Sequence, residues 1–352
     1  MSVMRPFTIA LSGALLAFAT SQALSQQTSP NPADQGKAKS QPELPKPATP
    51  EFNVAPPPAD DNDFKLSSEV EVVLLDVSVK DANGGFVSGL NKGSFKIFEN
   101  RIEQPISLFS AQDAPVTVGL VVDNSGSVRP KKPEIVTAAL TFVTQSNQRD
   151  EMFIVNFNDR VFKGLPENVP FTGESKVLRQ ALLTTQPQGR TALNDAIKIA
   201  LEHLEQGRLD KKTLVVISDG GDNASNTTKN EILRLVESSQ ATIYTVGIFN
   251  PDDKDKNPGF LRELARITGG EAFIPENTSH LVGICEKIAH DIRSRYSIGY
   301  SPSNRNHDGK IRRLRVVATG ENGRKLDVRS RTHYYAKISQ LPPEQSSKKD
   351  TR

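Results

Sequence analysis

The sequence contains almost no cysteine, the residue whose disulfides cross-link small folds, and little methionine or tryptophan. Its 352 residues include one cysteine, Cys285, three methionines and no tryptophan. A single cysteine excludes an intrachain disulfide, so the fold has to be held by an apolar core, for which a hydrophobic content of 36% is sufficient. Leu281, Ile284, Ile288 and Ile292 recur at helical spacing around Cys285, and this pattern predicts a buried structural thiol.

An excess of charge of one sign is also missing. Lysine and arginine number 44 against 41 aspartates and glutamates, a formal net charge of +3, and the basic residues do not gather on one helix face. Nucleic-acid binding normally needs such a basic face, so we expect no nucleic-acid partner.

Long hydrophobic runs are absent as well. The longest, Phe7 to Ala19, has 13 residues, whereas a membrane-spanning helix needs roughly 20. Arg5 precedes this run and the small residues of Ser21-Gln22-Ala23 follow it, with cleavage expected after Ala23 or Ser25. Residues 1–25 are therefore predicted to be a cleavable signal peptide, and the protein to be exported, periplasmic or secreted, with no membrane span.

The usual patterns of enzyme active sites are not found. The five histidines are scattered and never paired at metal-ligand spacing. No Gly-x-Ser-x-Gly elbow surrounds a serine nucleophile, and no Gly-x-x-x-x-Gly-Lys run could cradle a phosphate. We therefore expect no enzymatic activity and no catalytic residues.

Composition divides the chain into segments. Residues 26–63 are rich in proline, alanine and serine and predict a disordered linker. Residues 64–113 alternate apolar and polar positions, most clearly in Val73, Leu75, Val77 and Val79, and Ile106 with Leu108 continues this alternation further along. The segment therefore predicts an N-terminal β segment.

Residues 114–297 alternate apolar strands with amphipathic helices, which predicts an α/β fold with a doubly wound, mostly parallel sheet. The expected strands are 116–122, 152–157, 213–217 and 242–248, with helices that include one from near Pro130 and one over 279–293. Residues 298–336 return to alternation and predict a C-terminal β segment, followed by a disordered tail, 337–352. Since neither β segment is large enough to be stable alone, we expect them to pack together as a flanking β module.

Side chains with oxygen donors lie at three places in the α/β part, two directly after strands and one directly before a helix. Asp123-Asn124-Ser125-Gly126-Ser127 comes directly after the first strand. Thr191 introduces the helix near Leu193, and Asp219 follows the third strand. Ligands of α/β sheets bind beyond the carboxyl ends of the strands, so the three elements together predict a metal site. The alternative is helix capping, in which short polar side chains satisfy free amides at a helix start.

Asp-x-Ser-x-Ser, Thr191 in Gly-Arg-Thr-Ala-Leu and Asp219 in Ser-Asp-Gly stand in an order and spacing that resemble the metal-ion-dependent adhesion site of von Willebrand factor type A domains. This resemblance covers roughly residues 115–297. It implies that Ser125, Ser127 and Thr191 bind the ion directly, while Asp123 and Asp219 bind directly or through water. Because all donors are oxygens, Mg²⁺ or Mn²⁺ is expected rather than Zn²⁺.

The flanking β segments resemble, more loosely, a bacterial family of exported proteins related to von Willebrand factor A domains. The residues that carry this likeness are Ser88-Gly89-Leu90 and the pair Tyr334-Tyr335. No reaction is implied by it.

Three functions remain open from the sequence. The first is an exported binding protein whose metal ion bridges to an acidic side chain of a protein partner. The second is an envelope assembly or scaffold protein in which the metal is structural, and the third is a metal-dependent hydrolase. In addition, Arg313, Arg315, Lys325 and Arg329 predict a basic strand face, either a solvated edge that discourages aggregation or a surface for an acidic partner.

Overall fold

A computed structural model describes residues 71–249, 256–320 and 323–338. The predicted signal peptide (1–25), the predicted linker (26–63) and residues 339–352 of the predicted tail lie outside these ranges. Within the described ranges, every helix is too short or too polar to cross a membrane.

A six-stranded sheet forms the centre of the α/β part, with strand order β10-β9-β8-β5-β6-β7. Only β7 runs antiparallel to its neighbour, and the other five strands are parallel. The strands are β5 (Val116–Asp123), β6 (Glu151–Phe157), β7 (Val161–Lys163), β8 (Lys211–Ser218), β9 (Thr242–Gly247) and β10 (Ala272–Phe273).

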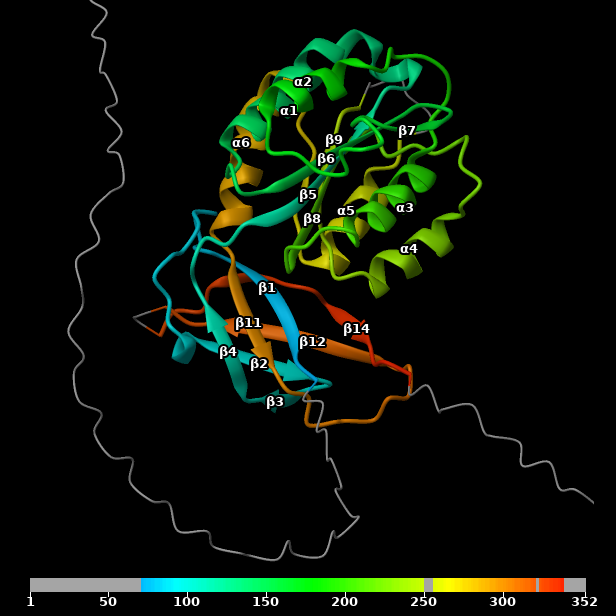
Figure 1. Cartoon of the computed structure of the whole chain (residues 1–352). Coiled ribbons are helices and arrows are strands. Elements are labelled where there is room, and N and C mark those ends of the chain that lie inside the picture. Colours follow the sequence, from blue (N-terminus) through cyan, green and yellow to red (C-terminus); the bar gives the residue numbers. More distant parts are fainter. Residues whose placement is uncertain (1–70, 250–255, 321–322, 339–352) are drawn as a thin grey trace, which may run out of the picture. The chain divides into compact units, whose positions relative to one another are not determined.

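Helices cover both faces of this sheet. One layer contains α1 (Lys132–Gln145), α2 (Ser175–Leu183) and α6 (Leu281–Arg293), and the other contains α3 (Leu193–Leu204), α4 (Lys229–Ser238) and α5 (Pro258–Thr268) (Figure 1). The predicted doubly wound α/β fold is confirmed. Cys285 lies on α6 and is buried, as predicted, and burial raises the pKa of its thiol to about 12.

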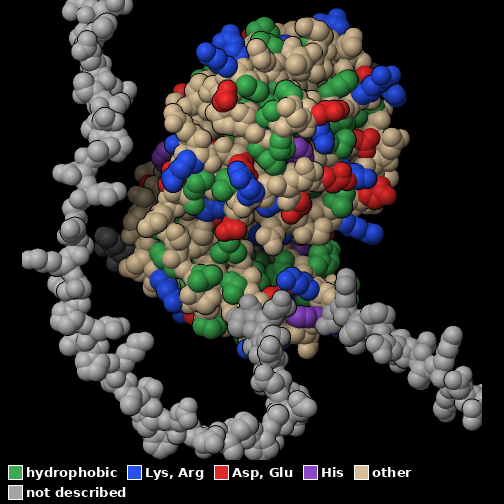
Figure 2. Space-filling view, in the orientation of Figure 1, with side chains coloured by type: hydrophobic (Ala, Val, Ile, Leu, Met, Phe, Trp, Pro, Cys, Tyr) green, Lys and Arg blue, Asp and Glu red, His purple; other side chains and the backbone are tan. Residues whose placement is uncertain are grey.

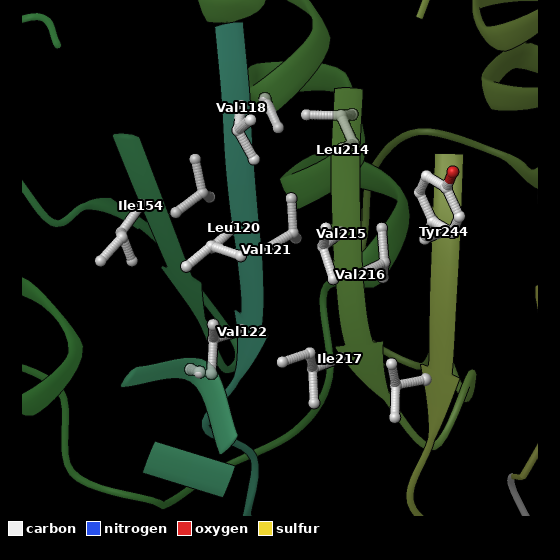
Figure 3. Close-up of a cluster of buried hydrophobic side chains, with 14 of the residues drawn as sticks. Val118, Leu120, Val121, Val122, Ile154, Leu214, Val215, Val216, Ile217 and Tyr244 are labelled. Carbon is white, nitrogen blue, oxygen red and sulfur yellow. The ribbon is translucent and has the colours of Figure 1, made fainter. Parts of the chain in front are cut away.

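The parallel strands are apolar along almost their whole length because helices cover both of their faces. Figure 3 shows the result, with Val118, Leu120 and Val122 of β5 packed beside Ile154 of β6 and Ile217 of β8. Each such side chain contributes roughly 1.5–3 kcal/mol by leaving water. The strands are thereby fixed, and their carboxyl ends give loops a rigid base.

Two four-stranded antiparallel sheets form the β module, in the orders β13-β1-β11-β4 and β14-β12-β2-β3. Their apolar faces enclose a second core, which includes Val77, Ile97, Tyr296 and Tyr300. Both β segments contribute to it, which confirms the predicted flanking module. The strands are β1 (Val73–Lys80), β2 (Phe95–Glu99), β3 (Ile102–Gln104), β4 (Ile106–Ser110), β11 (Tyr296–Tyr300), β12 (Ile311–Ala318), β13 (Asp327–Arg329) and β14 (His333–Tyr335).

Four details differ from the sequence prediction. Leu108 is 53% exposed, because the register of β4 against β11 shifts between Gly299 and Tyr300, and Phe109 packs on the core instead. The helix expected near Pro130 starts as a 3₁₀ turn, η2 (Gly126–Lys131), before α1 begins. The segment expected to be helical over 279–293 likewise opens with the 3₁₀ turn η3 (Thr278–His280), and the expected boundary at 297 falls inside β11.

A buried hydrogen-bonded group, here called the junction network, joins the β module to the α/β part. Asp291 of α6 accepts hydrogen bonds from the hydroxyls of Ser78 in β1, at 2.5 Å, and of Tyr244 in β9, at 2.7 Å. Arg295 donates from Nε to the Tyr244 hydroxyl, at 2.9 Å, and its Nη2 lies 3.9 Å from Asp291 Oδ2. Side chains of all four are buried, so the opposite charges are balanced inside the protein.

Candidate metal site

The loop after β5 is folded sharply by Asn124, whose backbone and side chain are both bound. Its backbone N–H donates to the carbonyl of Phe157, at 2.6 Å, and its carbonyl accepts from Gln188, at 2.9 Å. The side-chain amide donates to Val122 O and Asn156 Oδ1. Asn124 is fully buried. Asn124 therefore holds the loop in place, and the residues on either side of it point into the site.

Four of the five predicted residues, Asp123, Ser125, Ser127 and Asp219, are joined by hydrogen bonds and are here called the strand-end cluster. The backbone N–H of Ser125 donates to Asp123 Oδ1, at 2.8 Å. The hydroxyls of Ser125 and Ser127 lie 2.9 Å apart, and the Ser127 hydroxyl donates to Asp219 Oδ2, at 2.8 Å. The carboxyl ends of the neighbouring strands β5 and β8 thus present two carboxylates and two hydroxyls at one place.

Thr191, the fifth predicted residue, is held by its backbone. Its N–H donates to Asn223 Oδ1, at 2.9 Å, and its carbonyl accepts from the N–H groups of Asn223 and Ala224. The N–H of Gly126 donates to the carbonyl of Gly189, at 3.1 Å, which ties the Thr191 loop to the loop of the two serines. Among the described residues, the Thr191 hydroxyl has no hydrogen-bond partner, so it is available to a ligand.

Gly189 has a backbone conformation that favours glycine. Its φ is +72°, and a Cβ there would lie 2.7 Å from Oδ1 of the exposed Asp159 side chain, which can move aside. Any other residue would therefore be strained at this position. The Gly-Arg-Thr order therefore has a steric basis.

The structure argues against the capping interpretation. Ser125 occupies the N-cap position of η2, yet its side chain makes no capping hydrogen bond. The N-cap of α3 is Ala192 rather than Thr191. A genuine cap occurs elsewhere, at α4, where Thr228 and Glu231 form a complete capping box. The hydroxyls of the strand-end cluster bond to one another and to a carboxylate instead.

The two carboxylates of the cluster repel each other. Burial, with the nearby Asp219 charge as the second cause, raises the pKa of Asp123 to about 7, although hydrogen bonds from Ser218 and Ser125 oppose the shift. Burial lowers the pKa of Lys132 to about 8, against the charge of Asp123, and its ammonium group bonds to Asn124 Oδ1 and Leu182 O. Hard oxygen donors around two repelling carboxylates fit a divalent cation such as Mg²⁺.

In the described part of the chain, no three histidine, cysteine, aspartate or glutamate side chains lie together in a way that could hold a metal ion. The donor set proposed for the metal differs from such clusters because it combines two carboxylates with three hydroxyls. Hydroxyl ligands are common residues on any surface, so only their shared position at the strand ends identifies them.

Several supporting residues were not predicted from the sequence. Ser218, the last residue of β8, donates its hydroxyl to Asp123 Oδ2, at 2.7 Å, and so fixes the orientation of that carboxylate. Asp222 accepts from the N–H of Asn194, at 2.7 Å, and pins the loop after β8 to the start of α3. Ser218 is the first residue of the predicted Ser-Asp-Gly run and Asp222 follows it by two positions, so their proximity to Asp219 was the available signal.

Comparisons with known proteins identify a family for part of the chain. Residues 118–221 match the family described as von Willebrand factor type A domain. The chain is 24% identical over 127 residues to an uncharacterised protein of Borreliella burgdorferi and 23% identical over 168 residues to one of Synechocystis sp.. These matches cover 35% and 47% of this chain but only 37% and 39% of the two relatives. The chain thus spans about two fifths of the length of these curated relatives.

Solved structures with a similar fold include a von Willebrand factor type A protein from Catenulispora acidiphila. It is 14% identical, with a TM-score of 0.44, and the match covers 71% of this chain and 75% of that one. Proximal thread matrix protein 1 from the mussel byssus, described with a zinc-occupied MIDAS motif, is 18% identical, with a TM-score of 0.41. That match covers 51% of this chain and 48% of the mussel protein.

Proposed function

The chain contains a von Willebrand factor type A domain, and on that premise we propose that it is a non-enzymatic binding protein that captures a protein partner through a divalent metal ion. The observation that carries the proposal is the strand-end cluster, in which two buried carboxylates and two hydroxyls lie together at the ends of neighbouring strands. The unused hydroxyl of Thr191 completes a set of five oxygen donors. Such a set favours Mg²⁺ or Mn²⁺ over Zn²⁺.

In this proposal Ser125, Ser127 and Thr191 hold the ion through neutral hydroxyls, and Asp123 and Asp219 hold it directly or through water. The ion supplies positive charge and a coordination position open to a ligand from outside. Ser218 and Asn124 keep the carboxylate and the loop in place. A glutamate or aspartate side chain of the partner is the ligand that this charge and these hard donors select.

The described histidines support binding over hydrolysis, because their partners lie away from the strand ends. His203 bonds to the carbonyl of Pro170, and His333 lies 3.3 Å from Glu237. A hydrolytic metal site needs a general base or a paired nucleophile beside the ion. Lys132, the nearest titratable group besides the carboxylates, is engaged by Asn124.

The place of action that we propose is outside the cytoplasm, in the periplasm or the medium. The support comes from the sequence of residues 1–25, where a charged start, a 13-residue apolar run and small residues follow in the order of an export signal. A partner would then be found in the cell envelope or among secreted proteins.

The experiment uses the immobilised full chain to capture proteins from the native envelope fraction, with Mg²⁺ and with EDTA in parallel. Thr191→Val is the matched variant. Valine is similar in size to threonine but lacks the hydroxyl oxygen, and the substitution breaks no hydrogen bond to a described residue. We expect capture with Mg²⁺ by the wild type, and loss of capture with EDTA or in Thr191→Val. Amidation of the carboxyl groups in the envelope fraction should abolish capture as well.

Unchanged capture in EDTA and in Thr191→Val would contradict the metal bridge. If EDTA lowered the free energy of unfolding while capture persisted, the ion would be structural and the scaffold function would be favoured. Capture that needs Mg²⁺ but survives amidation of the partner fraction would retain the metal and exclude the carboxylate as its ligand.

A further inference from the structure

A cleft of about 510 Å³ lies between α5 and the β module, at the end of α5 remote from the strand-end cluster. Its base is made where backbones of the two parts touch. The N–H of Thr332 donates to the carbonyl of Ile267, at 3.2 Å, and a Cβ on Gly269 would lie 2.3 Å from the carbonyl carbon of Ser330. The residues at its base are therefore held in place by both parts of the protein.

Five arginines line this cleft, and no aspartate or glutamate does. We call it the arginine cleft. Arg262 and Arg266 come from α5, Arg315 from β12, and Arg329 and Arg331 from β13 and the residues after it. On the face of the molecule in Figure 2, by contrast, basic and acidic side chains are interspersed. The lining of the arginine cleft therefore differs from that face, on which charges of both signs are mixed.

Three of the five arginines, Arg262, Arg266 and Arg315, are exposed and form no ion pair with any described residue. The other two are positioned by the chain. Arg331 donates to the carbonyls of Glu237 and Ser239, which fixes the guanidinium without neutralising it. Arg329 lies 3.3 Å from Glu271, which also pairs with Lys80, and 4.0 Å from Asp327.

Structural explanations cover only part of this arrangement. Arg266 lies in the last turn of α5, where a cation complements the helix dipole. That explanation does not apply to Arg262, one turn earlier. The sequence suggested that Arg315 protects a sheet edge, and β12 pairs with β14 only over Ile311–Arg313, so Arg315 lies beyond that pairing. A charge at an unpaired edge discourages aggregation, but this does not account for the other four arginines that line the same cleft.

We propose that the arginine cleft binds a ligand that carries a phosphate group. Guanidinium groups pair with phosphate oxygens through two parallel hydrogen bonds. A phosphate carries about −1.5 to −2 charge at neutral pH, so it can balance several arginines, whereas a carboxylate carries only one negative charge. The cleft has the volume of a small-molecule site. Its apolar walls come from Leu314, Val316 and Val328, without an aromatic ring on which a nucleobase could stack.

The ligand can be a soluble phosphorylated molecule or the headgroup of a phospholipid, because both present the same phosphate. Isothermal titration of the full chain with inorganic pyrophosphate tests the first source. Co-sedimentation with vesicles of phosphatidic acid in phosphatidylcholine tests the second. The variant is Arg266→Gln/Arg315→Gln, which removes two arginines that hold no partner in the described structure, so that folding is not expected to change.

Arg149→Gln/Arg179→Gln is the control. Both arginines are exposed and lie outside the cleft, and their substitution removes the same net charge. We expect one pyrophosphate per chain, at least tenfold weaker binding in Arg266→Gln/Arg315→Gln, and unchanged binding in the control. Vesicle binding with the same variant pattern, without pyrophosphate binding, would support the proposal with a lipid as the source.

If both double variants lost the same amount of binding, the loss would be explained by net charge alone and the proposal would be overturned. So would failure of the wild type to bind either probe. Poly-glutamate supplies the remaining test: if it bound through Arg266 and Arg315 while pyrophosphate and vesicles did not, the cleft would be an acidic-protein site and the phosphate proposal would be wrong.

Discussion

The junction network and the strand-end cluster are both buried groups of charged and hydroxyl side chains, yet their charges are balanced differently. In the junction network, Asp291 faces Arg295 and accepts from two hydroxyls, so the chain supplies every partner. In the strand-end cluster, Asp123 and Asp219 face each other with serine hydroxyls between them, and the pKa of Asp123 rises to about 7. A pair of opposite charges stabilises the fold, whereas two like charges held close together favour a cation from outside.

The largest effect is expected when the balance of the junction network is broken. Arg295→Met should lower the free energy of unfolding by about 3–5 kcal/mol, because it leaves the Asp291 carboxylate buried without its cation. Urea denaturation measures this change. Glu286→Gln, an exposed position on the same helix, is the control and should change stability by less than about 0.5 kcal/mol.

A loss below about 1 kcal/mol in Arg295→Met would break the comparison, since the junction network would then be no more necessary to the fold than a surface pair. The result should also be independent of Mg²⁺. Dependence on Mg²⁺ would mean that the two groups are coupled.

The opposite behaviour is expected of Asp123→Asn in the strand-end cluster. Without divalent ions the variant should be at least as stable as the wild type, because one of two repelling carboxylates is gone. With Mg²⁺ at 100 times its dissociation constant, the wild type should gain about 2.7 kcal/mol of unfolding free energy and the variant should gain none. Thermal and urea unfolding with and without Mg²⁺ measure both differences.

Asp222→Asn is the matched control, because Asp222 lies on the same loop but binds Asn194 and Ser225 rather than the cluster. It should lose stability equally with and without Mg²⁺ and keep the full Mg²⁺ response. A variant Asp123→Asn that responds to Mg²⁺ like the wild type would remove the basis for a metal at this place.

Much of the fold followed from the sequence because its signals are local. Alternation and apolar runs located the strands, and the position of Asp123 and Asp219 directly after two of them predicted that they meet. The register shift that exposes Leu108 could not be predicted, because it depends on the pairing of β4 with β11, whose residues are far apart in the chain.

The same distinction applies to the sites. The five predicted donors stand beside recognisable strand ends or a helix start, but Ser218 and Asn124 support them through contacts that no spacing reveals. The junction network joins residues as distant as Ser78 and Asp291. The end of the β12–β14 pairing at Arg313, which leaves Arg315 beyond it, is likewise a property of the topology alone.

The smallest effect compares two hydroxyls at helix starts. Thr228 caps α4, so Thr228→Ala should cost about 1 kcal/mol of unfolding free energy with or without Mg²⁺. Ser125 occupies an N-cap position without capping, so Ser125→Ala should cost less than Thr228→Ala without metal and should weaken the Mg²⁺-dependent stabilisation. Parallel urea titrations in Mg²⁺ and in EDTA distinguish the capping role of Thr228 from the metal-binding role of Ser125. If both variants lost the same amount in both conditions, Ser125 would be an ordinary cap, and the hydroxyls at the strand ends would have a structural role like that of Thr228.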